Sequence, residues 1–275
     1  MMTTQTQASR HICLISGGKD STALALYMRD KHPEIDMEYV FCDTHKELEE
    51  TYEYLARIEA YLGKEIIRLK SDLGERAFDH YLDMRRGVLP SSSMRWCTAK
   101  LKIEPFERYV GDEPVHLYVG IRADENREGY ISTKPNIIPV FPFRDDGINY
   151  QDVKNLLEDS GVGLPKYYSW RTRSGCYFCF FQRKVEWVGL AENHPELFER
   201  AKQYEKDRNA HTKNGYTWAD GESLEELIAR KDEIIAEDAK RAEQRRKRQR
   251  PKTLAELFSG EVDPEEEVGC LICHL

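Results

Sequence analysis

The chain has 275 residues, of which 40% are hydrophobic and 33% are charged, and its formal net charge is −8 at pH 7. This length and composition can bury a full hydrophobic core, in one large domain or in one domain with an appendage. The negative net charge argues against a uniformly basic coat for nucleic acid, although local basic patches can still form.

No apolar stretch approaches the length of a membrane span, and Met1–Arg10 lacks the apolar centre of a signal peptide. We therefore expect a cytoplasmic protein with no membrane partner. In that compartment the seven cysteines do not suggest a disulfide framework, and ligands, redox groups or core residues explain them better. Cys13 and Cys42 lie inside apolar runs, where we expect core residues.

The most informative segment is residues 16–21, S-G-G-K-D-S, which lies between an apolar strand-like run at 12–15 and a helix-like run at 22–28. Two glycines let backbone N–H groups approach an anion, the helix N-terminus adds partial positive charge, and Lys19 supplies a full charge. This pattern predicts a cradle for nucleotide phosphates. The alternative is a purely structural turn between a strand and a helix.

The common ATP loop, G-x-x-x-x-G-K-[ST], does not fit this segment. Cys13 stands where its first glycine should be, and Asp20 stands where its magnesium-binding hydroxyl should be. A Walker-type phosphatase is therefore disfavoured, and the loop belongs to a different class of phosphate-binding turn.

Strand and helix signals alternate along the rest of the first half. The predicted elements are strands at 37–42, 65–69, 116–120 and 137–140, and helices at 48–62, about 75–84 and from about 97 onward. Such alternation implies an α/β fold, a doubly wound, mostly parallel sheet that is covered by helices. In this class, ligands bind at the carboxyl ends of the strands.

Asp43 is the first acidic residue after the second predicted strand. A carboxylate at a strand's carboxyl end can accept hydrogen bonds from ribose hydroxyls or help to hold a metal ion. The alternative is a turn or N-cap residue for the helix that follows. His45, two residues further on, is interpreted as a solvated loop histidine and is not included in the site.

Residues 120–127, G-I-R-A-D-E-N-R, follow the fourth predicted strand. Arg122 and Arg127 flank Asp124 and Glu125, so that two guanidinium groups can clamp phosphates while the acids position a magnesium ion. The alternative is a cluster of surface salt bridges.

Three cysteines have the spacing of a sulfur site. Cys176 and Cys179 form a C-x-x-C inside an aromatic-rich loop, and Cys97 lies in the segment R-W-C-T-A-K-L-K. Two thiolates at this spacing can bind one metal, and nearby cations favour the thiolate form. An iron–sulfur site, a zinc site, and a redox pair with a core cysteine all remain open.

The C-terminal third carries two further features. Residues 222–250 are highly charged, show an imperfect helical stripe and end in a basic run at 240–250, which suits a phosphate backbone, an acidic partner or a solvated helix tip. Beyond Pro251 and an acidic spacer, Cys270 and Cys273 form a second C-x-x-C. This pair could carry sulfur as a persulfide, complete a cluster, resolve a disulfide or chelate zinc.

The order of these motifs along the chain resembles that of the PP-loop ATP pyrophosphatases. The motifs are the S-G-G-x-D-S loop, Asp43, residues 97–102, the G-I-R-x-D-E-x-x-R motif and the C-x-x-C at Cys176. The resemblance is to their phosphoadenosine phosphosulfate (PAPS) reductase-like branch and covers about residues 12–192. It implies an adenine nucleotide alpha-hydrolase-like fold at 1–192, with a helical C-terminal extension at 193–250 and a flexible tail at 251–275.

The resemblance also implies roles for individual residues. Catalytic charge stabilisation is expected from Lys19 and Arg122. The expected nucleotide-binding residues are Ser16, Gly17, Gly18, Lys19, Asp20, Ser21, Asp43, Arg122, Asp124, Glu125 and Arg127. Asp43, Asp124 and Glu125 are expected to contact ribose or Mg²⁺. Cys97, Cys176 and Cys179 are expected to bind an iron–sulfur cluster, and Cys270 and Cys273 to carry sulfur.

The implied reaction converts ATP to AMP and pyrophosphate while a substrate oxygen is adenylylated, so that sulfur can replace it. The chain most resembles the ATP pyrophosphatases of the bacterial DNA phosphorothioation systems Dnd and Ssp. That likeness implies DNA as the substrate and a cysteine desulfurase or other sulfur donor as the partner. Because Trp96 precedes Cys97, a four-iron cluster would need another ligand or leave one iron open.

Three alternatives remain open from the sequence. The chain could reduce PAPS or adenylyl sulfate, although its tail lacks the Glu-Cys-Gly-x-His pattern of those reductases. It could thiolate tRNA, which demands the same activation step, and no sequence feature separates tRNA from DNA. It could also be a non-catalytic nucleotide-binding scaffold, against which the intact loop lysine argues. A homodimer is a candidate assembly.

Overall fold

The computed structural model describes residues 9–126, 134–209, 216–219 and 221–248. These residues form two units, the first ending at Cys179 and the second beginning at Phe180. The division falls earlier in the chain than the boundary expected after residue 192, so that the helix Lys184–Asn193 (α8) belongs to the second unit.

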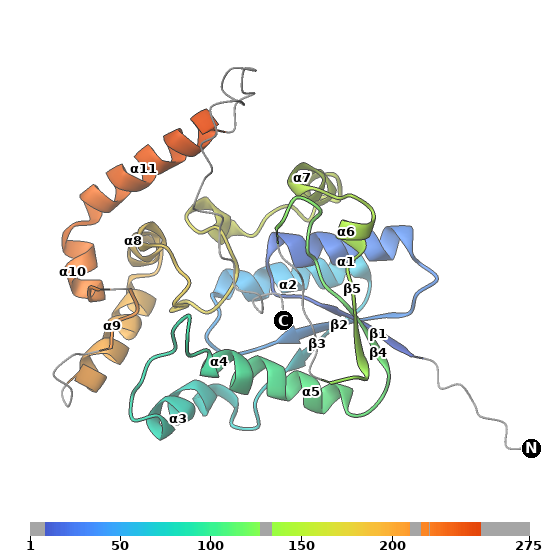
Figure 1. Cartoon of the computed structure of the whole chain (residues 1–275), viewed down its shortest axis with the longest axis horizontal. Helices are drawn as coiled ribbons and strands as arrows, with labels where there is room; N and C mark the ends of the chain where they lie inside the picture. Colours follow the sequence, from blue (N-terminus) through green and yellow to red (C-terminus); the bar gives the residue numbers. More distant parts are fainter. Residues whose placement is uncertain (1–8, 127–133, 210–215, 220, 249–275) are drawn as a thin grey trace, which may run out of the picture. The chain divides into compact units, whose positions relative to one another are not determined.

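A five-stranded sheet forms the centre of the first unit (Figure 1). Its strands are β1 (Arg10–Leu14), β2 (Met37–Cys42), β3 (Ile66–Leu69), β4 (Val115–Tyr118) and β5 (Ile137–Val140). They lie in the order β3-β2-β1-β4-β5, and every neighbouring pair is parallel. This confirms the predicted parallel α/β sheet.

The strand order reverses direction beside β1, and this reversal decides where a ligand site can form. The chain builds outward from β1 through β2 to β3, and then crosses to the other side of β1 to place β4 and β5. The chain therefore leaves β1 and β4 toward opposite sides of the sheet, and the carboxyl end between these two strands is the place where open α/β sheets bind ligands. Residues 16–18 lie in the loop after β1, residues 19–21 form the first turn of α1, and residues 120–126 follow β4.

Helices cover both faces of this sheet (Figure 1). The helices of the first unit are α1 (Lys19–Lys31), α2 (Glu49–Leu62), α3 (Ala77–Met84), α4 (Trp96–Thr98), α5 (Glu104–Val110), α6 (Pro142–Asp145) and α7 (Tyr150–Asp159). Short 3₁₀ turns lie at Gly74–Arg76 and Lys166–Ser169. The helix expected from about residue 97 is present, but a π-helical segment, Ala99–Ile103, interrupts it between α4 and α5.

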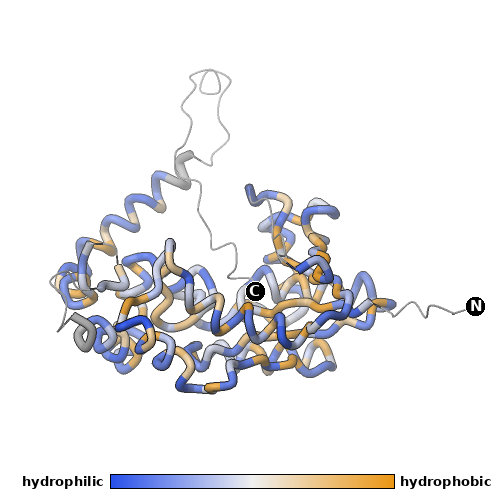
Figure 2. The backbone as a smooth tube through the Cα atoms, turned by 60° about the horizontal axis from the view of Figure 1, so that its bottom comes forward, coloured by the Kyte–Doolittle hydropathy of each residue, from blue (hydrophilic) through white to orange (hydrophobic). Residues whose placement is uncertain are grey.

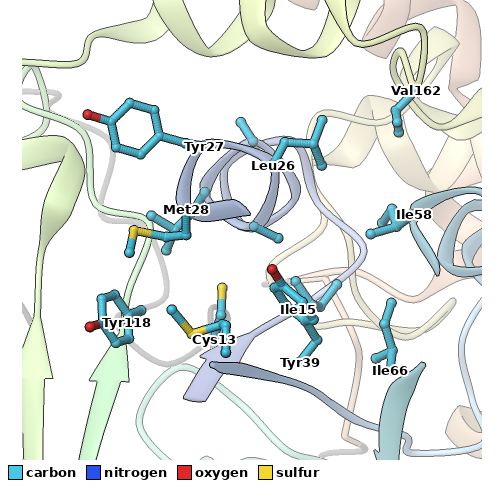
Figure 3. Close-up of a cluster of buried hydrophobic side chains, with 14 of the residues drawn as sticks. Cys13, Ile15, Leu26, Tyr27, Met28, Tyr39, Ile58, Ile66, Tyr118 and Val162 are labelled. Carbon is cyan, nitrogen blue, oxygen red and sulfur yellow. The ribbon is translucent and has the colours of Figure 1, made fainter. Parts of the chain in front are cut away.

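Alternating side chains of the strands build two cores. Cys13 points to one face and packs with α1, α2 and α7, while Ile12 and Leu14 point to the other face and pack with Phe106 of α5. Figure 3 shows the first of these cores, with Cys13 and its neighbours on the sheet facing Met28 of α1. Cys13 and Cys42 are both buried in these cores, as the sequence predicts.

The second unit contains α8, α9 (Pro195–Asn209), α10 (Leu224–Ala229) and α11 (Lys231–Arg248). Buried Glu205 ties α9 to the start of α10, because its carboxylate accepts hydrogen bonds from the backbone of Trp218 and Leu224 at 2.8 Å each. The sequence predicts one charged, helical segment at 222–250. The structure has two helices there, α10 and α11, which are separated at Arg230. Figure 2 shows α11 as mostly hydrophilic.

The described part of the chain contains no helix with the length and apolarity needed to cross a bilayer.

Candidate functional site

The loop between β1 and α1 is closed by its own hydrogen bonds. The hydroxyls of Ser16 and Ser21 lie 3.0 Å apart, the backbone N–H of Ser16 donates to Ser21 Oγ at 3.1 Å, and the N–H of Gly18 donates to Ser16 Oγ at 3.3 Å. Gly17 has a left-handed φ of 75°, a conformation that favours glycine. The sequence therefore folds here into a tight turn at the N-terminus of α1, as a phosphate cradle requires.

Both glycines of this loop are also required by space. A Cβ atom on Gly17 would lie 2.8 Å from Thr51 Cγ2 of α2, and one on Gly18 would lie 2.9 Å from Ser174 Oγ. At the end of β4, a Cβ on Gly120 would lie 3.0 Å from the carbonyl oxygen of Asp20. The loops after β1 and β4 are thus packed together without room for larger residues.

Five charged residues of the prediction meet at this switch point. Asp20 lies between two cations. Its Oδ2 atom is 2.9 Å from Lys19 Nζ, and its Oδ1 atom is 2.8 Å from Arg122 Nη1. Arg122 also contacts Asp124 at 2.9 Å and Glu125 at 2.8 Å. The structure therefore brings Lys19, Asp20, Arg122, Asp124 and Glu125 into one network.

This network holds Arg122 in its charged form. Burial by itself lowers the pKa of the Arg122 guanidinium, but attraction to Asp20 and Glu125 and the hydrogen bonds to Asp20 and Asp124 raise the pKa above its ordinary value. Only 14% of the Arg122 side chain is exposed. A largely buried guanidinium of fixed charge is suited to bind an anion that arrives at the loop.

Tyr150, which begins α7, was not predicted. Its ring lies beneath both cations, with the Lys19 ammonium 5.5 Å and the Arg122 guanidinium carbon 5.4 Å from its centroid. These are cation–π distances. The sequence carries no local signal for this contact, because Tyr150 is distant in the chain from both residues.

Two further tyrosines, from the 3₁₀ turn Lys166–Ser169, also contact the loop. The Tyr167 hydroxyl donates to the carbonyl oxygen of Gly17 at 2.6 Å, and the backbone N–H of Lys19 donates to the Tyr168 hydroxyl at 3.1 Å. Ser174 Oγ donates to Ser16 Oγ at 3.2 Å. The sequence analysis identified this region only as aromatic-rich and assigned these residues no role.

Asp43 lies at the carboxyl end of β2, as predicted, and it organises the turn there. Its Oδ1 accepts hydrogen bonds from the backbone N–H of His45 and from the Tyr52 hydroxyl, each at 2.8 Å. The hydrogen bonds and ion pairs of Asp43 within the described residues do not reach the phosphate loop. The structural role weighed from the sequence is therefore present, while nucleotide binding by Asp43 stays a prediction.

The same turn carries two residues that the sequence analysis did not select. His45 adopts a left-handed φ of 56°, and its Nε2 atom is buried without a hydrogen-bond partner. This contrasts with the solvated loop histidine expected there. Glu47 accepts a hydrogen bond from Thr44 Oγ1 at 2.9 Å, while its second carboxylate oxygen is buried without a partner.

The predicted sulfur residues lie close together. Burial, and then the neighbouring Cys179, raise the pKa of the Cys97 thiol to about 12, while Lys102 opposes the shift. Burial and then Glu47 raise the pKa of the Cys176 thiol well above its usual range, and Cys179 adds to this. Burial therefore favours the thiol form of Cys97 and Cys176 over the thiolate in this arrangement.

The loop that carries Cys176 is held by a buried arginine. Arg171, which is 1% exposed, donates to the carbonyl oxygens of Gly175 and Cys176 at 2.9 Å each. The Cys176 thiol lies 3.1 Å from Thr44 Oγ1 and 3.7 Å from a Glu47 oxygen. It is thus turned toward the β2 loop by two contacts with that loop.

Among the described residues, no three His, Cys, Asp or Glu side chains are arranged to hold a metal ion. As placed, Cys97, Cys176 and Cys179 form no preassembled metal group, and the Cys176 thiol faces Thr44 and Glu47. The cluster and its zinc alternative stay predictions. The acids beside Arg122 likewise form no preassembled Mg²⁺ cage, and Mg²⁺ commonly enters such sites with the substrate phosphates.

Three predicted site residues cannot be placed. Arg127, Cys270 and Cys273 lie outside the described residues.

Known relatives resemble parts of this chain. Two uncharacterized proteins of Methanocaldococcus jannaschii align with 67% of this chain, each at 28% sequence identity. The aligned part spans 39% of the length of one of them and 45% of the other. An uncharacterized 37.8 kDa protein of Escherichia phage 186 is 25% identical over 260 residues, which cover 73% of this chain and 75% of the phage protein.

Two solved structures are also similar to it. One is a PAPS reductase from Candida auris in a phosphate complex. The alignment covers 63% of this chain and 84% of the reductase chain, with 16% sequence identity and a TM-score of 0.48. A U34-tRNA thiolase from Methanococcus maripaludis, with its [4Fe-4S] cluster, aligns with 80% of each chain at 14% identity and a TM-score of 0.36.

The family is shown by the sequence itself. The profile of the phosphoadenosine phosphosulfate reductase domain matches residues 10–180, which span the parallel sheet, the phosphate loop, the Arg122 network and the C-x-x-C at Cys176. This match covers more than half of the chain. The chain therefore belongs to the phosphoadenosine phosphosulfate reductase domain family.

Proposed function

We propose that this protein is a PP-loop ATP pyrophosphatase, which adenylylates a substrate oxygen so that sulfur can replace it. The observation that carries the proposal is the network at the carboxyl ends of β1 and β4. There Asp20 holds Lys19 and Arg122 at 2.8–2.9 Å over a glycine turn that opens α1. Two cations and the N–H groups at a helix N-terminus suit a polyphosphate.

The reaction assigns separate tasks to these residues. The loop around Gly17 and Gly18 binds the β- and γ-phosphates through backbone N–H groups. The acceptor oxygen then attacks the α-phosphorus, and the bond from this phosphorus to the bridging oxygen breaks. Lys19 and Arg122 stabilise the charge that develops on the departing pyrophosphate. Mg²⁺ would neutralise phosphate charge, and Asp124 and Glu125 would hold it.

The adenylylated oxygen is a good leaving group in the second step. A sulfur nucleophile, supplied by a cysteine desulfurase or another donor protein, attacks the activated centre. The bond from that centre to the adenylylated oxygen breaks, and AMP leaves with this oxygen. Where the donor sulfur is a persulfide, a second thiol then attacks the donor's cysteine sulfur, the sulfur–sulfur bond breaks, a disulfide forms, and the outer sulfur stays on the substrate.

We propose a DNA backbone phosphate as the acceptor. Support comes from the resemblance of the motifs to the DNA phosphorothioation enzymes and from the basic run at the end of α11, which suits a polyanion. The second candidate is reduction of a sulfonucleotide, which the family match itself favours. The tail lacks the cysteine pattern of those reductases, so we place this candidate second.

A product analysis tests the activity. Purified protein with ATP and MgCl₂ is expected to release AMP and pyrophosphate slowly, as measured by mass spectrometry, and Lys19→Ala is expected to abolish this release. Lys31→Ala is the matched control, because Lys31 lies on the same helix in an exposed position. Release of ADP and orthophosphate would contradict the proposed class.

A genetic experiment tests the substrate. Loss of the enzyme from its host is expected to remove phosphorothioate-linked dinucleotides from digested DNA and to leave growth on sulfate intact. Cysteine auxotrophy with unchanged DNA sulfur would reject DNA thiolation in favour of sulfonucleotide reduction. Loss of thiolated tRNA nucleosides instead would keep the chemistry and replace the substrate.

A further inference from the structure

The backbone N–H of Lys19 is a donor that the helix cannot use. Lys19 is the first residue of α1, and the first N–H groups of a helix have no acceptor one turn earlier. At an anion site these groups point at the ligand. In this structure the N–H of Lys19 donates to the hydroxyl of Tyr168 at 3.1 Å, so that this hydroxyl lies beside the position where a phosphate would bind.

The two neighbouring tyrosines use their hydroxyl protons differently. Tyr167 donates its proton to the carbonyl oxygen of Gly17 at 2.6 Å, so this proton is already committed. The Tyr168 hydroxyl acts as an acceptor, and no residue in the described part of the chain accepts a hydrogen bond from it. Burial is the main cause that raises the pKa of the Tyr168 hydroxyl, so it keeps its proton at any working pH.

The position of Tyr168 is fixed from several sides. Its ring centroid lies 5.3 Å from that of Tyr167, and the Tyr167 hydroxyl is itself hydrogen-bonded to the carbonyl oxygen of Gly17. The 3₁₀ turn that carries both residues follows Pro165, and Ser174 ties the same segment to Ser16. A hydroxyl held in this way can donate without the entropic cost of ordering a free side chain.

We propose that Tyr168 is a phosphate-binding residue, which accepts the N–H of Lys19 and donates its own proton to a phosphoryl oxygen of the nucleotide. This inference rests on the proposed function and adds a donor that the loop motif does not contain. A hydrogen bond from a neutral donor to a charged phosphate is stronger than one between neutral groups. The opposing account is a plug, in which the hydroxyl competes with the phosphate for the Lys19 N–H.

Calorimetric titration of the full-length protein with inorganic pyrophosphate and with ATP, both with Mg²⁺, separates these accounts. We expect Tyr168→Phe to weaken binding of both ligands about 10-fold, which corresponds to ~1.4 kcal/mol. Its thermal unfolding midpoint should stay close to that of the wild type, because the change removes one hydrogen bond and keeps the ring that lies against Tyr167. The Tyr168→Phe change removes the oxygen and keeps the ring, so packing is preserved.

Tyr167→Phe is the matched control, because its hydroxyl serves the fold and has no proton left for a ligand. We expect it to lower the unfolding midpoint and to weaken pyrophosphate binding less than Tyr168→Phe does. Equal or tighter binding by Tyr168→Phe would overturn the inference, and tighter binding would establish the plug. If the wild type binds neither pyrophosphate nor ATP, the proposed function itself fails.

Discussion

The phosphate loop and the cysteine loop of the first unit differ in how far the protein's own atoms organise them. Around Asp20, every charged side chain has an oppositely charged partner within 3 Å, and the turn is closed by its own serines. Around Cys176, the thiol faces a threonine and a carboxylate, and burial raises the pKa of the Cys97 and Cys176 thiols. The comparison indicates that the proposed phosphate site is preorganised, whereas the described cysteines form no preassembled metal group.

The largest effect is expected at Gly17. Gly17→Ala places a Cβ atom 2.8 Å from Thr51 in a left-handed backbone, so the turn must open, and we expect loss of ATP binding and of turnover. Gly63→Ala is the control, because Gly63 has a similar φ of 65° with nothing within 4 Å of its Cβ position. The control pays only the left-handed strain, roughly 1–2 kcal/mol, and should keep full activity. Equal activities of the two variants would show that the turn is not preorganised.

The second-largest effect is expected at the guanidinium group of Arg122. Arg122→Lys keeps one charge but cannot span Asp20, Asp124 and Glu125 together, and we expect kcat for AMP formation to fall about 10²-fold. Arg29→Lys, on the exposed side of α1, is the control and should leave kcat unchanged. Steady-state kinetics give the answer, and an unchanged kcat for Arg122→Lys would remove this residue from the catalytic machinery.

The cysteine loop is tested by its metal content. If the loop assembles on metal binding, anaerobically purified protein should contain iron and sulfide, and both should be lost in Cys176→Ser and in Cys179→Ser. Cys13→Ser changes a core cysteine and should retain the metal. Stoichiometric zinc would assign the loop a structural role. Protein with neither metal would leave the redox or persulfide pair that the C-x-x-C spacing also allows.

The smallest effect is expected at the opposite end of β1. Burial, and then repulsion from the stacked ring of His116, lower the pKa of His11 below 6.5. The unfolded chain therefore binds the proton more tightly than the folded protein does, and stability should fall as the pH drops below about 6.5. His11→Gln should flatten this dependence in thermal melts between pH 7.5 and pH 5.5. An equally steep loss in the variant would assign the acid sensitivity to other groups.

Local patterns in the sequence predicted much of the fold. The bounds of β2 and β5 agree with the predicted strands, and the helix predicted at 48–62 ends at Leu62, where Gly63 follows with a left-handed φ of 65°. These features depend on neighbouring residues, which a sequence shows directly. The break at Arg230 was missed, because the apolar residues on either side of it keep a nearly helical spacing.

The site was predictable only where a motif carried it. The loop and the residues after β4 have fixed spacings, so their meeting at the switch point could be expected. Tyr150 and Tyr168 reach the loop from more than 100 residues away, and nothing local marks them. The spacing of Cys176 and Cys179 showed that they are near each other, but not that the Cys176 thiol faces Glu47.

The central claim concerns which phosphorus atom of ATP is attacked. Without an acceptor substrate, water takes the place of the acceptor oxygen, so slow turnover in H₂¹⁸O marks the site of attack. Our account predicts that mass spectrometry finds the ¹⁸O in AMP, with unlabelled pyrophosphate as the other product. Finding the ¹⁸O in orthophosphate, with ADP as the second product, would contradict it.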